Sequence, residues 1–88
     1  MAGELYKAEV VWDRAGGEFL MSRYHRTHEL RFEGGVVVPA SAAPASLPAG
    51  IVNAHASVDP EQALVASVSS CHMLFALAFF SKAGFIVD

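Results

Sequence analysis

The sequence contains little cysteine and little charge. Only one of its 88 residues is cysteine, so no disulfide can form within the chain and a zinc site built from a cysteine cluster is excluded. Charged residues make up 17% of the sequence, and nine acidic against six basic side chains give a formal net charge of −3. This balance argues against a nucleic-acid-binding protein.

A secretory signal is also missing from the start of the sequence. Met1–Lys7 has no basic segment followed by an apolar run, so we expect a cytoplasmic location. Residues 63–81 carry no charge and are long enough for a membrane span to be considered. Ser70 and His72 would then lie in the middle of the bilayer, so we favour a helix buried in protein and no membrane partner.

The sequence is rich in apolar residues, which make up 53% of the chain. A domain of this size cannot bury most of its surface, so this fraction is high for a monomer. Residues 1–33 hold five of the six basic and six of the nine acidic side chains, whereas residues 34–58 hold none. We therefore expect one incomplete domain over residues 1–88, with a partner subunit, further sequence, or both.

The first 38 residues show the alternation typical of β-strands. Apolar and polar residues alternate from Leu5 to Trp12, and residues 13–17 are typical of a turn. We predict a second strand from Glu18 to about His25, which would form a hairpin with the first. Residues 30–38 predict further strand, interrupted near the glycine pair at 34–35.

A long loop and a long helix are predicted for the rest. Residues 39–58 are rich in Ala, Ser and Pro, which favours an irregular loop. A helix is predicted over residues 59–83, because Asp59 can act as N-cap, Gln62 can complete a capping box and Gly84 suits a left-handed C-cap. Its apolar side chains surround the helix, which indicates a central element covered on most sides.

Cys71 lies near the middle of this helix and is the candidate nucleophile. Its neighbour His72 points about 100° away around the helix, so the two cannot form a thiolate–imidazole pair. The site is also too far from the helix N-terminus for the dipole to lower the thiol pKa. An inert core cysteine is the alternative, and activation requires a cation from another element.

An arginine is the natural cation for such a site, because it is permanently charged and can bond both a thiolate and a substrate oxygen. Strand alternation would place Arg23 on the same face as Phe19 and Met21, so Arg23 faces the helix if they do. The candidates are Arg14, Arg23, Arg26 and Arg31, and alternation would place Arg26 on the opposite face, with Leu20 and Tyr24. A solvated surface arginine is the alternative for each of them.

Glu61 lies in the first turn of the predicted helix, where a carboxylate is favourable against the dipole without any catalytic role. It is ten residues, or about 15 Å of helix, from Cys71, so the two cannot share a site within one helix. A homodimer with antiparallel helices would bring Glu61 of one subunit toward Cys71 of the other. Histidine spacings support no metal site, and the paired glycines match no phosphate-binding motif, so we expect no cofactor.

Several motifs resemble the OsmC/Ohr family of osmotically inducible and organic hydroperoxide resistance proteins. The main one is Pro60-Glu61-Gln62 followed by Cys71, with nine residues between the glutamate and the cysteine. The runs Ser22-Arg-Tyr-His25, Phe32-Glu-Gly-Gly35 and Val38-Pro-Ala-Ser41 resemble an OsmC-like subgroup. The similarity extends over about residues 10–88.

The resemblance implies an α+β fold, with antiparallel N-terminal strands followed by a long central helix in an intertwined homodimer. It also implies a thiol peroxidase that reduces organic hydroperoxides in defence against oxidative stress. By motif match Cys71 is the peroxidatic cysteine and Glu61 orients the activating arginine, for which Arg23 is our first choice and Arg14 the rival.

The sequence departs from the family pattern in one respect. It stops at Asp88, where family members continue with more strands, another helix and a resolving cysteine, so it resembles an N-terminal fragment. With one cysteine, turnover requires an external dithiol reductant. The alternative function is a non-catalytic module that forms homodimers or binds small apolar ligands.

Overall fold

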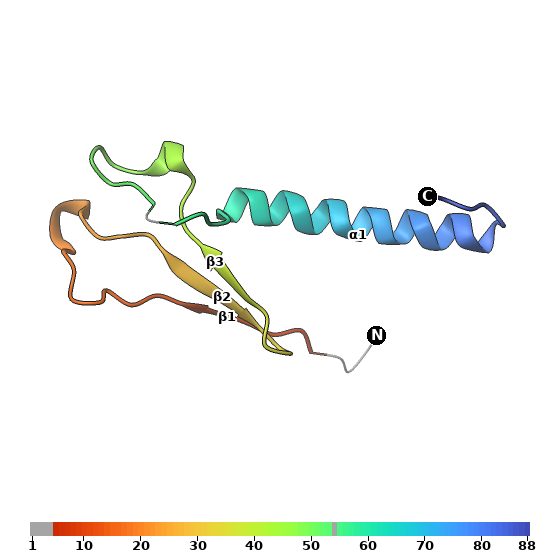
Figure 1. Cartoon of the computed structure of the whole chain (residues 1–88), viewed down its shortest axis with the longest axis horizontal. Coiled ribbons are helices and arrows are strands. Elements are labelled where there is room, and N and C mark those ends of the chain that lie inside the picture. The colour runs from red at the N-terminus through yellow and green to blue at the C-terminus, as the bar shows by residue number, and fades with distance from the viewer. Residues whose placement is uncertain (1–4, 54) are drawn as a thin grey trace.

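The computed structural model describes residues 5–53 and 55–88 and contains one sheet and one long helix (Figure 1). Residues 1–4 and Ala54, which belong to the predicted strand region and loop, lie outside the described residues. The elements are β1 (Ala8–Val11), the 3-10 turn Leu20–Ser22, β2 (His28–Phe32), β3 (Val37–Ala40), the 3-10 turn Pro44–Ser46 and α1 (Pro60–Lys82). The predicted α+β fold of antiparallel strands followed by a long helix is confirmed.

The three strands form an antiparallel sheet in the order β1-β2-β3. Val10, Leu30 and Val38 are register partners across it, which aligns one apolar row on a single face. The turn between β2 and β3 lies at the predicted glycine pair. Gly34 and Gly35 have φ values of +89° and +93°, a left-handed backbone that glycine adopts at little cost.

The prediction of a second strand from Glu18 to His25 is wrong. This segment is a loop that contains the 3-10 turn, with Met21 and Ser22 in left-handed conformations at φ +59° and +62°. Its geometry follows from contacts that alternation does not encode, because Phe19 and Tyr24 pack their rings 5.2 Å apart. The strand that pairs with β1 is therefore β2.

Backbone hydrogen bonds join the two ends of the predicted loop between the strands and the helix. β3 extends to Ala40, and an isolated bridge joins Ala40 to Val58. The Ser41 amide donates to the Val58 carbonyl at 3.0 Å, and the Val58 amide donates to the Pro39 carbonyl at 3.0 Å. This bridge fixes where the chain enters the helix.

Helix α1 begins and ends at the predicted signals. The Asp59 carboxylate accepts from the Gln62 amide at 2.8 Å, and the Gln62 side chain accepts from the Asp59 amide at 3.1 Å. Both halves of the capping box are therefore present. At the other end Gly84 has a φ of +88°, which suits a residue that follows the last helical turn.

The chain has almost no core of its own. Among the described residues only Ala40, Ser41 and Asp59 are buried, and none of them lies within α1. The chain exposes 7367 Å², whereas a compact chain of 9.4 kDa exposes about 5,000 Å². Its radius of gyration is 18.0 Å, against about 12 Å for a compact domain of this length. Figure 1 shows the reason, because α1 extends well beyond the sheet.

Helix α1 is also long and apolar enough to cross a membrane. Its most apolar stretch has a mean hydropathy of 1.9. The core helix of a soluble protein meets the same criterion of length and composition. The criterion therefore does not distinguish a membrane span from a helix that another chain covers.

Candidate functional site

Cys71 occupies the middle of α1, eleven residues from each end of the helix. Its thiol is free and exposed, and it makes no hydrogen bond with the residues that the structure describes. Large apolar side chains surround it along the helix, and all of them are exposed in the single chain. The site thus combines one accessible thiol with an apolar surface.

Glu61 lies in the first turn of α1, next to the N-cap. It is exposed, and within residues 5–53 and 55–88 its carboxylate makes no ion pair or hydrogen bond. The two side chains are ten residues apart on one continuous helix, or about 15 Å along its axis. One chain therefore does not bring Glu61 and Cys71 together, as their spacing predicts.

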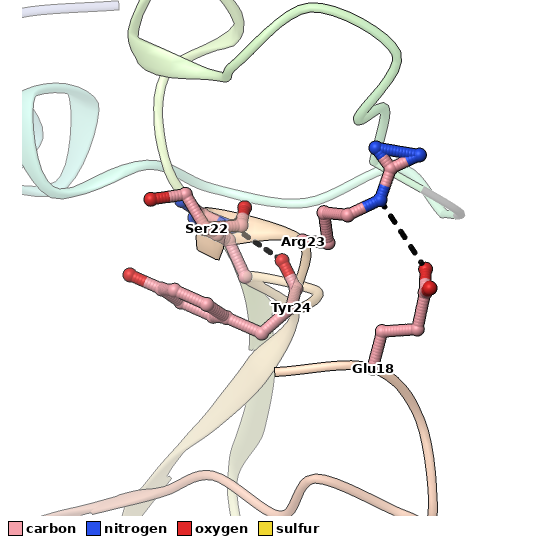
Figure 2. Close-up of polar contacts among 5 residues, drawn as sticks. Glu18, Ser22, Arg23 and Tyr24 are labelled. Atoms are coloured by element: carbon pink, nitrogen blue, oxygen red, sulfur yellow. Dashed lines mark hydrogen bonds and ion pairs between the residues drawn. The ribbon is translucent and has the colours of Figure 1, made fainter. Parts of the chain in front are cut away.

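Arg23 and Arg14 lie on the loop between β1 and β2, where both line one shallow hollow. Arg23 is exposed, and its Nε atom lies 3.8 Å from a carboxylate oxygen of Glu18 (Figure 2). Arg14 donates through NH1 to the Gly17 carbonyl at 2.7 Å. The argument that placed Arg23 on a strand face is wrong, because no strand forms there. Its assignment to the site rests on the resemblance and stays a prediction.

A groove of about 420 Å³ lies where the loop after β1, strand β2 and the start of α1 meet. Three aromatic side chains form much of its wall: Trp12 lies 6.1 Å from Phe19 and 6.1 Å from Tyr24, centroid to centroid. The Trp12 indole also donates to the His25 carbonyl at 3.0 Å, which fixes the ring against the loop. The groove volume is within the range of small-molecule sites.

Arg26 also lines this groove, and it is half-buried. Its guanidinium carbon lies 3.6 Å from the centre of the Tyr24 ring, and its NH1 donates to the Ser22 carbonyl at 2.9 Å and to the Tyr24 carbonyl. The Arg26 carbonyl in turn accepts from Nδ1 of His28 at 2.7 Å. The side chain is therefore held in one orientation by local contacts.

Arg26 is one of the four candidate arginines, but strand alternation placed it on the face opposite Arg23, and the groove itself was not predicted. The signal that was available is the gathering of Trp12, Phe19 and Tyr24 in a short, turn-rich segment beside an arginine. This pattern becomes informative only when the segment is taken as a loop, because a strand would separate these side chains onto two faces. No group of three or more potential metal ligands gathers in the part of the chain that the structure describes.

Comparison with solved structures gives a match over nearly the whole chain. An OsmC-like protein of unknown function from Vibrio cholerae O1 biovar eltor is 38% identical, with a TM-score of 0.87. The match covers 97% of this chain and 55% of that one, so the present chain spans about half the length of its structural relative. A scan against protein-family models and a search of curated proteins found no match.

The sequence identity to this relative and the shared fold agree with the motifs around Glu61 and Cys71. The three antiparallel strands and the long helix match those of the relative over the same span. The chain belongs to the OsmC-like family.

Proposed function

We propose that this chain is part of a thiol-dependent peroxidase that reduces organic hydroperoxides at Cys71. The observation that carries the proposal is the free, exposed thiol at the middle of an apolar helix, ten residues after Glu61, in an OsmC-like chain. Only the thiolate form of cysteine is an effective nucleophile, so the site also needs a cation beside the sulfur.

The proposed reaction is a two-electron transfer from sulfur to peroxide. The Cys71 thiolate attacks the distal oxygen of the hydroperoxide, an S–O bond forms and the O–O bond breaks. The leaving alkoxide takes up a proton and departs as the alcohol, while the cysteine becomes a sulfenic acid. The peroxide is thereby reduced and the sulfur oxidised.

Organic hydroperoxides fit the surroundings of the thiol better than hydrogen peroxide does. Phe75 and Phe79 lie four and eight residues after Cys71, on the same side of α1, and Met73 lies two residues after it; each exposes a large apolar side chain. An alkyl group packed against such side chains gains binding energy that hydrogen peroxide lacks. We therefore propose alkyl or lipid hydroperoxides as the substrates.

A second copy of the chain completes the site in this proposal. The chain exposes about 2,400 Å² more than a compact protein of its mass, an excess of the size that obligate interfaces bury. The apolar surface of α1 supplies a large part of it, because Leu64, Val68 and Phe75 are 65%, 62% and 76% exposed. Burying this surface in a homodimer removes it from water.

The spacing of Glu61 and Cys71 defines how the two helices pair. If the helices are antiparallel and Glu61 faces the partner's Cys71, their crossing lies midway, at residue 66. Glu61 and Cys71 are about 80° apart around α1, and the apolar residues Leu64, Val68 and Phe75 lie between them. One face can therefore present both functional side chains and the apolar residues that would hold the dimer together.

The activating arginine is proposed to come from the loop between β1 and β2. Arg23 is our first choice, because its contact with Glu18 is long and exposed and costs little to break. Arg14 remains the rival, although its NH1 is engaged at the Gly17 carbonyl. In this proposal Glu61 accepts hydrogen bonds from the arginine and orients it toward the sulfur.

An external dithiol is proposed to return Cys71 to the thiol. These 88 residues contain one cysteine, so the sulfenic acid has no second thiol within this span. A small dithiol first condenses with the sulfenic acid, releasing water, and its second thiol then displaces Cys71 as a thiolate.

Intact-protein mass spectrometry tests the proposed peroxidase directly. The protein is treated with one equivalent of an alkyl hydroperoxide or of hydrogen peroxide, beside a Cys71→Ser variant. Rapid gain of one oxygen, faster with the alkyl hydroperoxide and absent from the variant, is the expected result. A folded protein whose Cys71 stays unmodified would overturn the proposal.

The aromatic groove favours a second candidate, a ligand-binding module without turnover. The groove does not include Cys71 or Glu61 in its lining, so a ligand can occupy it without thiol chemistry. The Cys71→Ser variant separates the two functions, because it abolishes peroxide reduction and leaves ligand binding unchanged.

A further inference from the structure

The groove carries a single formal charge. Of the residues that line it, Arg26 is the one that is permanently ionised, and the others are aromatic, aliphatic or polar side chains, with His28 among them. The protein as a whole has a net charge of −3, so a positive apolar groove differs from its general character. Such a groove complements a ligand with an apolar body and one negative charge.

Arg26 has no carboxylate partner in the described part of the chain. The ion pairs recorded there join Arg23 to Glu18 and Arg31 to Glu29. Nη1 of Arg26 donates to two backbone carbonyls, and its Nε and Nη2 make no hydrogen bond with the described residues. A half-buried guanidinium with one free edge is suited to bind a carboxylate in a bidentate manner.

The start of α1 offers the groove no second anion-binding group. Pro60 lines the groove, and Asp59 and Glu61 are its neighbours in the sequence. The Asp59 carboxylate accepts from the Gln62 amide, so that amide is already taken. Among the residues that line the groove, Arg26 carries the permanent positive charge for an anion.

We infer that this groove binds a small aromatic carboxylate, with the ring against Trp12, Phe19 and Tyr24 and the carboxylate on Arg26. The inference rests on the second candidate function above and is independent of the thiol chemistry. Aromatic rings pack favourably at centroid distances of about 4.5–7 Å, the range in which Trp12, Phe19 and Tyr24 already pack against one another. The charge-assisted pair with Arg26 supplies the selectivity.

Trp12 provides the readout, because it is the sole tryptophan in these 88 residues and it lines the groove. The purified protein is titrated with benzoate and, separately, with benzamide, which has the same ring and no charge. We expect saturable change in Trp12 emission with benzoate, at a dissociation constant roughly 10-fold or more below that of benzamide.

Two matched variants locate the selectivity. Arg26→Gln is expected to bind benzoate and benzamide equally, whereas Arg31→Gln removes the same charge outside the groove and should keep the preference. Arg26→Lys keeps the charge without the planar fork and should give an intermediate preference. Circular dichroism checks that each variant retains its fold.

Three results would overturn the inference, and they have different consequences. Equal binding of benzoate and benzamide to the unmodified protein would refute the role of Arg26 while leaving the groove as a site for neutral ligands. Loss of the preference in Arg31→Gln would show a general charge effect. Failure of both compounds to bind would also remove the second candidate function, without bearing on oxidation of Cys71.

Discussion

The sheet and its loops make contacts with one another within the chain, whereas helix α1 is exposed along its length. The strands pair with one another, the long loop is tied by the bridge between Ala40 and Val58, and the buried residues lie at positions 40, 41 and 59. Helix α1 has its capping box at one end and a capped last turn at the other, yet none of its residues is buried. A helix can thus be fully specified locally and still lack the surface against which it packs.

The two candidate sites differ in the same way, because one can form within a single chain and the other cannot. Cys71 and Glu61 belong to the helix and cannot meet within one chain, whereas Arg26 and the aromatic groove are assembled within it. We propose that the thiol site forms between two chains and that the groove forms in each chain alone. In that case α1 depends on a second copy of the chain more than the sheet does.

The largest effect is expected from a charge on the proposed helix interface. Val68→Asp would bury a carboxylate without a partner between two helices, so dimer affinity should fall by at least about 100-fold. Analytical ultracentrifugation measures the change. Val52→Asp places the same charge on an exposed loop residue and should leave the assembly unchanged. Equal behaviour of the two variants would refute the interface on this face.

A smaller effect is expected from the cap of α1. Asp59→Ala removes the acceptor of the Gln62 amide and should lower the free energy of unfolding by about 1 kcal/mol. Asp59→Asn keeps an acceptor and should lower it much less. Chemical denaturation at fixed protein concentration gives the values. An Asn variant as unstable as the Ala variant would show that the charge, and not the cap, matters.

The smallest effect is expected on the exposed face of the sheet. Glu29→Ala breaks the pair in which Arg31 donates from Nε and NH2 to one carboxylate oxygen at 3.0 and 2.8 Å. Both side chains are about half exposed, so the free energy of unfolding should change by less than about 0.5 kcal/mol. A loss above 1 kcal/mol in denaturation would mean that this face is covered in the assembled protein.

Local signals predicted the helix, and long-range contacts explain what they missed. The capping residues Asp59 and Gln62 act within one turn, so the sequence alone was sufficient to locate the start of α1. The loop at residues 18–25 depends on packing among Trp12, Phe19 and Tyr24, residues separated by up to twelve positions. The alternation of polar and apolar residues within the segment does not encode that packing.

The candidate site was predictable to a similar extent. The helical positions of Cys71 and Glu61 followed from their spacing, and so did the conclusion that they lie too far apart within one chain. The placement of Arg23 relied on a strand that does not form. Arg26 was among the candidate arginines, but its position could not be predicted because its orientation depends on the Tyr24 ring and on two loop carbonyls.

The most direct test of the account is a cross-link between the two halves of the proposed thiol site. Glu61→Cys introduces a second thiol, which cannot bond Cys71 of the same helix because disulfides need Cα atoms within about 7 Å. Under mild oxidation we expect a covalent dimer joined between position 61 and the partner's Cys71, identified by peptide mapping. Gln62→Cys, one residue further around the helix, should cross-link far less. A chain that dimerises without the 61–71 link, or links equally from position 62, would contradict the proposed antiparallel site.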